Sequence, residues 1–315
     1  MQNNATTKKQ SFLDKHHFLL RRLHSLTGIF PIGLFLIPHL TTNSSILWGA
    51  FNKRADEVLA PGSAAADEEA FARGVATFWK EVQFINELPF LLLIEIALWV
   101  SIGYHAAFGV VYAVTGKGNT GRYKYQSNWR YTLQRWTGYI GIFFILYHIA
   151  TLRWGWAFLV PGGTEWNHNY ASATTAAAIQ GSFEGITPAG FAVAAFYMLG
   201  VTALVFHFAN GLWTAAITWG LTVTAQAQKR WGYVCAAVGV GLMTLGWASV
   251  YGFATLDAER AMVLEKAMVE QKKQRAVDQD DPQAGQRLEQ NPNRSAEQTG
   301  PSAPEPVRAP FGFLR

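Results

Sequence analysis

Apolar residues gather in five long runs along this 315-residue chain, and polar residues fill both ends and the loops between the runs. Each run is long enough to cross about 30 Å of hydrocarbon as an α-helix, which rises about 1.5 Å per residue. The runs cover residues 26–48, 88–114, 131–160, 190–221 and 232–256. The third and fourth runs are longer than a span requires, which favours tilt or a helical extension beyond the lipid. We therefore predict an all-α fold, an integral membrane bundle of five transmembrane helices.

The polar segments outside the runs divide the chain further. The predicted parts are an N-terminal arm at 1–20, the membrane domain at 21–256, a surface helix at 257–275 and a disordered tail at 276–315. The tail is rich in Gln, Asp, Pro, Ser and Glu, a composition typical of disorder. The loop at 52–87 contains apolar residues every three to four positions from Phe71 to Val82. This spacing predicts an amphipathic helix at 68–84 that lies at the outer membrane interface.

Basic residues are concentrated on one side of the predicted bundle. The N-terminal arm, the loop at 116–130 and the last loop, with Lys229 and Arg230, carry an excess of Lys and Arg. The loops at 52–87 and 161–187 hold more acidic than basic residues. Since basic loops stay in the cytoplasm, the N-terminus is predicted to be cytoplasmic. The net charge of +5 then follows from topology, and no nucleic-acid partner is needed to account for it.

One histidine lies within each of the first four apolar runs. These histidines are His39, His105, His148 and His207. A ring that titrates near neutrality is costly in hydrocarbon unless it is neutral and either ligated or hydrogen-bonded. A single histidine of this kind is more often a packing residue, so the arrangement of all four decides how they are interpreted.

The four histidines recur in a duplicated unit. The string Ser-Leu-Thr-Gly28 stands before His39, and Arg-Trp-Thr-Gly138 stands in the same way before His148. The second and fourth histidines are each followed by a glycine four residues later, one turn away on the same helix face. The repeat therefore pairs the first histidine with the third and the second with the fourth.

Paired histidines also fall at similar predicted depths. At about 1.5 Å per residue, His39 and His148 lie roughly 25 and 20 Å from the cytoplasmic boundary. His105 and His207 each lie roughly 18 Å from that side. The sequence therefore predicts two bis-histidine metal sites, with the 105/207 pair nearer the cytoplasm. Haem held by two histidines has no open axial position, which suits electron transfer, and two stacked haems would carry electrons across the membrane.

Other metals fit this pattern less well. Zinc sites usually add a carboxylate or Cys, and copper sites favour Met or Cys. Cys235 is the single cysteine, which excludes iron–sulfur ligation and an internal disulfide. His16, His17 and His168 stand in polar segments, so we expect these three side chains to be solvated.

Further polar residues are candidates for cofactor binding and proton transfer. His24, Ser25, Arg22 and Arg135 stand at the predicted cytoplasmic boundary. Such donors can hold haem propionates or a quinone carbonyl, although Arg side chains at this level also extend into lipid headgroups. Glu95 is an acid within a predicted span and is a candidate catalytic residue for proton relay beside a quinone. A hydrogen bond between helices is the alternative role for Glu95.

Longer strings of residues around these sites resemble a known family. They include Arg-Arg-Leu-His24-Ser-Leu-Thr-Gly, Phe-Leu-Ile-Pro-His39-Leu, Tyr-His105-Ala-Ala-Phe-Gly-Val, Gln-Arg135-Trp-Thr-Gly and Val-Phe-His207-Phe-Ala-Asn-Gly-Leu-Trp. Over residues 18–253 the chain resembles the di-haem cytochrome b anchor subunits of succinate dehydrogenases (succinate:menaquinone oxidoreductases) and the related fumarate reductases. The loop at 52–87 and the segments after 256 depart from the short form of the family.

The resemblance implies five spans and two haems b. It implies axial ligation of these haems by the histidines of the two pairs, His39 with His148 and His105 with His207. It also implies a flavoprotein subunit and an iron–sulfur subunit docked on the cytoplasmic side of a bacterial cytoplasmic membrane. Electrons from succinate, a tricarboxylic acid cycle intermediate, would pass through these subunits and the two haems to menaquinone.

Two other functions are compatible with part of this pattern. A cytochrome b of another quinone-linked dehydrogenase, such as formate dehydrogenase or hydrogenase, is the first. The bc-type cytochromes are disfavoured because they carry two histidines on each of two helices. A membrane transporter with a parallel repeat is the second, but broken helices and midplane polar groups beyond the histidines are missing from the sequence.

Overall fold

The computed structural model describes residues 12–59, 66–116 and 128–278, which form helices and loops without a strand. The α-helices are α1 (Phe12–Ile29), α2 (Ile32–Trp48), α3 (Ala66–Asn86), α4 (Leu91–Thr115), α5 (Asn128–Leu152), α6 (Ala171–Gln180), α7 (Pro188–Thr218), α8 (Ala225–Thr255) and α9 (Ala258–Asp278). Short 3-10 helices are η1 (Gly49–Phe51), η2 (Lys53–Val58), η3 (Ala157–Leu159) and η4 (His168–Tyr170). The predicted all-α class is confirmed. The chain divides into two compact units, Met1–Val269 and a second unit that begins at Glu270.

Four segments of the described chain are long and apolar enough to cross a membrane. They are Lys15–Phe51, Leu91–Thr115, Pro188–Thr218 and Ala225–Thr255. The fifth predicted span forms α5, which is not among the four because its first turns carry Arg130, Gln134 and Arg135. This helix ends at Leu152 and not at residue 160, and the chain then turns through Gly155, whose φ of 68° suits glycine. Five spans therefore remain a prediction.

The first apolar run forms two helices. The chain breaks between α1 and α2 at Pro31, which has no backbone N–H to continue the hydrogen bonding of α1. Helix α1 also begins at Phe12, well before the predicted span at 26–48. The predicted arm at 1–20 therefore overlaps this helix, and residues 1–11 lie outside the described residues.

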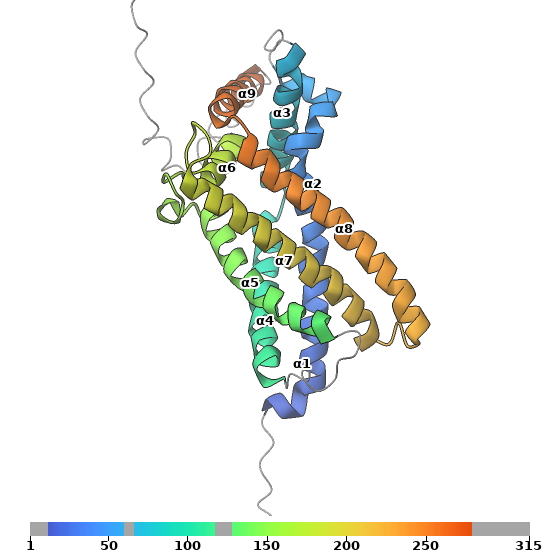
Figure 1. The fold of residues 1–315 in the computed structure, drawn as a ribbon. Helices are drawn as coiled ribbons and strands as arrows, with labels where there is room; N and C mark the ends of the chain where they lie inside the picture. Colours follow the sequence, from blue (N-terminus) through green and yellow to red (C-terminus); the bar gives the residue numbers. More distant parts are fainter. Residues whose placement is uncertain (1–11, 60–65, 117–127, 279–315) are drawn as a thin grey trace, which may run out of the picture. The chain divides into compact units, whose positions relative to one another are not determined.

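Small residues allow the long helices to approach one another. Helix α7 lies between α5 and α8 and packs on both, while α2 packs on α8 and α1 on α4 (Figure 1). A Cβ added at Gly200 of α7 would lie 2.1 Å from the ring of Phe144 in α5. One added at Gly246 of α8 would lie 2.4 Å from Val201 of α7. Helices in lipid associate largely through such close packing, so these glycines fix the bundle.

One end of the bundle carries a helical cap, formed by α3, η4, α6 and residues 258–269 of α9. Its core is continuous with Phe253 near the end of α8 and includes Val75 and Phe78 of α3. These two side chains belong to the apolar face predicted for the helix at 68–84. That face is buried against the protein, so the prediction that it lies on the membrane interface is wrong. All ten residues of α6 are buried, and they supply the surface that covers the apolar face of α3.

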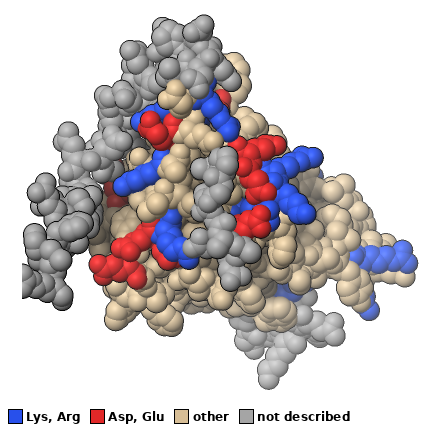
Figure 2. Space-filling view, turned by 90° about the horizontal axis from the view of Figure 1, so that it is seen from above, with Lys and Arg blue, Asp and Glu red and all other residues tan. Residues whose placement is uncertain are grey.

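The cap also buries a histidine that the sequence places in a polar loop. His168 in η4 is only 7% exposed, and its backbone oxygen accepts a hydrogen bond from Gln83 Nε2 at 2.9 Å. The prediction of a solvated side chain is therefore wrong for this residue, because α3 covers it. Seen from above, acidic and basic side chains lie interspersed on the surface (Figure 2). Lys80 of α3 forms an ion pair with Glu57 of η2 at 3.2 Å.

Candidate metal centres

The structure brings the histidines together in the two pairs that the repeat predicts. His105 of α4 faces His207 of α7, with ring centroids 6.0 Å apart and planes at 81°. His39 of α2 faces His148 of α5, with centroids 5.6 Å apart and planes at 82°. A metal ion bound by two imidazoles lies about 2 Å from a nitrogen of each ring. The ring centroids are then separated by these two bonds plus the distance from each centroid to its nitrogen, and the observed separations are of this size. Each pair can therefore hold one metal ion between its rings.

Backbone carbonyl groups set the tautomer of the 105/207 pair. His105 Nδ1 lies 2.9 Å from the backbone oxygen of His24, and His207 Nδ1 lies 3.1 Å from that of Gln134. A carbonyl oxygen only accepts, so Nδ1 is the protonated nitrogen of each ring. Nε2 then keeps its lone pair for a metal, the arrangement expected of a metal-binding histidine.

The two carbonyl groups occupy equivalent positions of the repeat, each four residues before a glycine that lies against a histidine ring of the pair. A Cβ at Gly28 would lie 2.5 Å from Cε1 of His105. A Cβ at Gly138 would lie 3.1 Å from Cε1 of His207. The duplicated Thr-Gly string therefore has a physical reason, because it lets α1 and α5 pass close to the ligand rings.

Aromatic rings surround the 39/148 pair. His148 stacks near Phe144, with centroids 5.7 Å apart, and meets Tyr197 of α7 edge-on at 5.9 Å. His39 stacks on Phe35 of its own helix at 5.1 Å. His148 Nδ1 is buried and has no hydrogen-bond partner among the residues that the structure describes. This pair is thus more apolar in its surroundings than the 105/207 pair.

The known proteins that this chain resembles include a cytochrome b subunit. No family model matches the chain. It is 34% identical over 238 residues to the succinate dehydrogenase cytochrome b558 subunit of Bacillus subtilis (strain 168). The match covers 75% of this chain and 96% of that relative. The chain belongs to the succinate dehydrogenase cytochrome b subunits. With its four apolar helices, this member of the family is a multi-pass membrane protein. The match extends over nearly all of the relative, so the remaining quarter of this cytochrome b subunit is additional to it.

The predicted boundary residues do not all play the same part in this cytochrome b subunit. His24 stacks on His105, with centroids 4.0 Å apart and planes at 14°, so it lies beside a ring of the 105/207 pair. The guanidinium of Arg22 lies over the ring of Trp219 at 5.1 Å. Arg135 Nη2 donates to the backbone oxygen of Gly116 at 3.3 Å, and Ser25 is half-buried on α1.

Three buried polar atoms of α1 and α4 lack a partner within the described ranges. They are Arg22 Nε, His24 Nδ1 and the hydroxyl of Tyr112. The rings of His24 and Tyr112 meet edge-on, with centroids 5.5 Å apart. No role for Tyr112 was predicted from the sequence, although this residue stands seven positions after His105, two turns along the same face of α4. His24 Nδ1 and the Tyr112 hydroxyl are thus unpaired polar atoms on two side chains that touch each other beside His105.

Glu95 forms an ion pair with Arg153, the residue after α5. Arg153 Nε donates to Oε1 at 2.7 Å and Nη2 donates to Oε2 at 3.1 Å. The Glu95 side chain is 16% exposed and that of Arg153 is 40% exposed. Sequence reasoning missed Arg153, although it was a lone basic residue near the end of the third apolar run. The pair joins α4 to the end of α5, and Trp99 and Trp154 meet edge-on beside it.

Glu81 of α3 is a second acid that the sequence did not single out. Its side chain is partly buried and hydrogen-bonds to Ser45 and Thr42 at the end of α2. Its Oε2 is buried without a partner in the described part of the chain. Burial raises the pKa of this carboxyl, against the effect of the two hydroxyl groups. The sequence signal for Glu81 was its position next to Val82, at the edge of the apolar face of α3.

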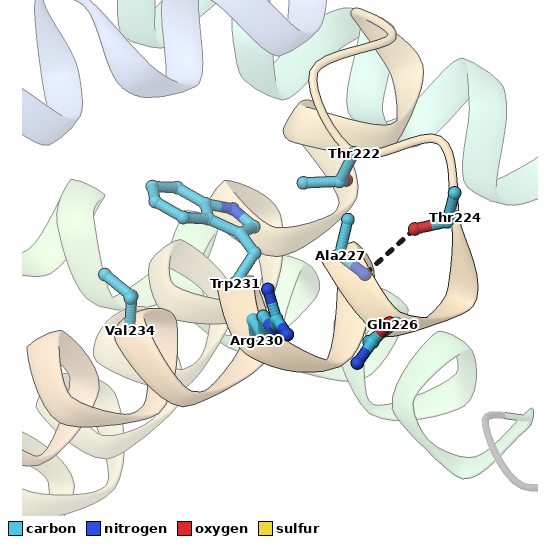
Figure 3. A pocket seen from close by; sticks show the side chains of 7 residues that line it. All are labelled: Thr222, Thr224, Gln226, Ala227, Arg230, Trp231 and Val234. Carbon is cyan, nitrogen blue, oxygen red and sulfur yellow. Dashed lines mark hydrogen bonds between the residues drawn. The ribbon is translucent and has the colours of Figure 1, made fainter.

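A surface cavity of about 380 Å³ lies at the turn between α7 and α8 (Figure 3). Its lining residues are Thr222, Thr224, Gln226, Ala227, Arg230, Trp231 and Val234. The hydroxyl of Thr224 accepts from Ala227 N at 3.1 Å and starts α8. The cavity contains none of the four paired histidines. No group of three or more His, Cys, Asp or Glu side chains that could hold a metal ion occurs in the described segments, so each candidate centre offers two protein ligands.

Proposed function

We propose that the chain is the membrane-anchor cytochrome b subunit of a bacterial succinate dehydrogenase and holds two haems b. His105 and His207 would be the axial ligands of the inner haem, and His39 and His148 those of the outer haem. The observation that carries the proposal is the pairing of four histidines from four helices at ring separations of 6.0 and 5.6 Å. Family membership supports the same reading.

The residues around the inner pair fit a haem. The orphaned donors Arg22 Nε, His24 Nδ1 and the Tyr112 hydroxyl would bind propionate oxygens, which need charge-assisted or strong donors. Ser25 and Arg135 are further proposed contacts at this level. When bound, two haems with both axial positions closed would supply one-electron transfer across the membrane to menaquinone. The protein supplies fixed ligand rings, a dry environment and propionate donors.

The proposed partners follow from the predicted orientation. The flavoprotein and iron–sulfur subunits of succinate dehydrogenase would dock on the cytoplasmic side, where the basic N-terminal arm and basic loops are predicted. The inner pair lies nearer that side, and the outer pair and Glu95 nearer the opposite one. The bilayer of a bacterial cytoplasmic membrane would surround α2, α4, α5, α7 and α8.

Glu95 is the proposed proton-handling residue on the menaquinone side. Its pairing with Arg153 supports this role, since the guanidinium can hydrogen-bond to a quinone carbonyl while the carboxylate exchanges a proton. The same ion pair would also serve as a tie between α4 and α5. The two roles are separable because only the first makes quinone reduction depend on a proton acceptor at position 95.

The test is a pyridine haemochrome assay with an optical redox titration on the purified complex. Two haems b per chain with separate midpoint potentials are expected. His105→Ala should lose the inner haem, half of the haem absorbance, and should block succinate-driven quinone reduction because one axial bond is missing. Retention of both haems in this variant would contradict the ligand assignment, and absence of haem from the wild-type complex would contradict the function.

A further inference from the structure

We propose that Gln134 and Asn210 form an amide clamp that positions His207, one of the two ligands of the inner haem. The inference rests on the proposed function. It assigns positioning roles to two residues that are not among the proposed haem ligands. Gln134 lies on α5, and Asn210 lies on α7 one turn beyond His207.

Gln134 and His207 are joined by two hydrogen bonds of opposite direction. His207 Nδ1 donates to the backbone oxygen of Gln134 at 3.1 Å. Gln134 Nε2 donates to the backbone oxygen of His207, also at 3.1 Å. The first bond fixes the ring and the second fixes the helix that carries it. Together they set the height of His207 against α5 and the direction in which Nε2 points.

Asn210 fixes the side chain of Gln134. Its Nδ2 donates to Oε1 of Gln134 at 2.8 Å. An amide whose oxygen accepts on one side presents its NH₂ group on the other, so Gln134 Nε2 is directed at His207. Without Asn210, the Gln134 side chain could rotate and its bond to His207 would be lost.

Packing alone does not explain an amide at position 210. Asn210 is only 4% exposed, and its Oδ1 is buried with no partner among the described residues. A buried acceptor without a partner is destabilising, and an apolar side chain of similar size would avoid that cost. The bond from Asn210 to Gln134 is therefore the physical reason for an Asn at this position.

The other half of the repeat holds its ligand in another way. His24 stands at the position equivalent to Gln134, and its backbone oxygen accepts from His105 Nδ1 at 2.9 Å. Its side chain stacks on the ring of His105, and Phe108 stands at the position equivalent to Asn210. The backbone bond is thus common to both halves, whereas the amide clamp is specific to His207. The amides are therefore not required by the helix packing that the two halves of the repeat share.

The experiment compares Asn210→Leu and Gln134→Met with wild type in the complete membrane complex. Haem content, an optical redox titration and low-temperature electron paramagnetic resonance are measured. We expect the midpoint potential and g-values of one haem to shift or that haem to be lost, because its axial ring is no longer fixed. The other haem should keep its values. The double variant should resemble the more affected single variant, since the two amides act as one unit.

A matched control separates the clamp from a general effect of removing an amide. Asn86→Leu changes an Asn of α3 whose Nδ2 bonds to Val82 in its own helix at 2.9 Å, and both haems should keep their values. If Asn210→Leu fails to assemble, Asn210→Ala gives the same readout. Unchanged potentials and g-values in both single variants would overturn the clamp and leave the proposed function intact. A wild-type complex without haem would overturn both.

Discussion

Gly28 shows how much of the inner site depends on a single missing side chain. A Cβ at this position would lie 2.5 Å from Cε1 and 3.0 Å from Nδ1 of His105. The ring cannot simply move away, because its Nδ1 is bonded to the backbone oxygen of His24. At the equivalent Gly138 the added atom would lie 3.1 Å from His207, a contact that a small shift relieves. The two repeat positions should therefore differ in their tolerance of alanine.

We predict that Gly28→Ala displaces the His105 ring and removes the inner haem. The pyridine haemochrome assay should then give about half of the wild-type haem, because one of the two haems loses an axial bond and is not retained. Gly103→Ala is the matched control, because a Cβ added there in α4 meets nothing within 4 Å. It should retain both haems. Full haem content in Gly28→Ala would show that α1 and α4 can separate at no cost to the site.

At the scale of elements, the start of α6 depends on an acid from another helix. Glu265 of α9 is fully buried, and its carboxylate accepts from the backbone N–H groups of Ser172 at 2.7 Å and Ala173 at 3.1 Å. Tyr170, the residue before α6, provides no side-chain cap. Glu265 therefore satisfies donors that α6 cannot satisfy itself. Burial raises the pKa of Glu265 to about 8.

We predict that this carboxyl makes the cap less stable as pH rises. Its pKa in the folded protein, about 8, lies above its ordinary value of 4.5, so between these values the folded state holds a proton that the unfolded state has lost. Stability from this group is complete below pH 4.5 and is lost as pH rises through 8. Glu265→Gln should flatten the fall in Tm over this range. The measurement is thermal unfolding at several pH values, and an unchanged slope would contradict the assignment.

The sequence indicated the elements that carry the histidines but not the contacts that hold them. Repeat and depth were enough to pair His105 with His207, because helical spacing alone determines both. The small Ala, Ser and Thr residues of α6 gave no sign of burial, since only the fold of α3 and α9 around them makes a core. Arg153 and the clamp residue Asn210 were missed for a similar reason. Each bonds to a residue more than 50 positions away, a relation that no local pattern contains.

At the scale of the whole molecule, the candidate sites form a series along the bundle. The 105/207 pair lies nearer the predicted cytoplasmic side, the 39/148 pair follows, and Glu95 stands ten residues before His105 on the way to the other side. The ion pair of Glu95 with Arg153 joins the two halves of the repeat there. A structural tie and a proton acceptor at this place predict different consequences of neutralising the acid.

We predict that Glu95→Gln slows menaquinone reduction about a hundredfold, the lower end of the range for losing a general acid–base group. Reduction of the haems by succinate should persist, since the histidine pairs are untouched. Stopped-flow spectroscopy of haem reduction, set beside steady-state quinone reduction, separates the two steps. Glu57→Gln, which breaks the exposed pair with Lys80, is the control and should change neither. Were Glu95 only a tie between α4 and α5, the Gln variant would lose haem or thermal stability together with both rates. A slowed quinone step with intact haems would instead place proton transfer at Glu95.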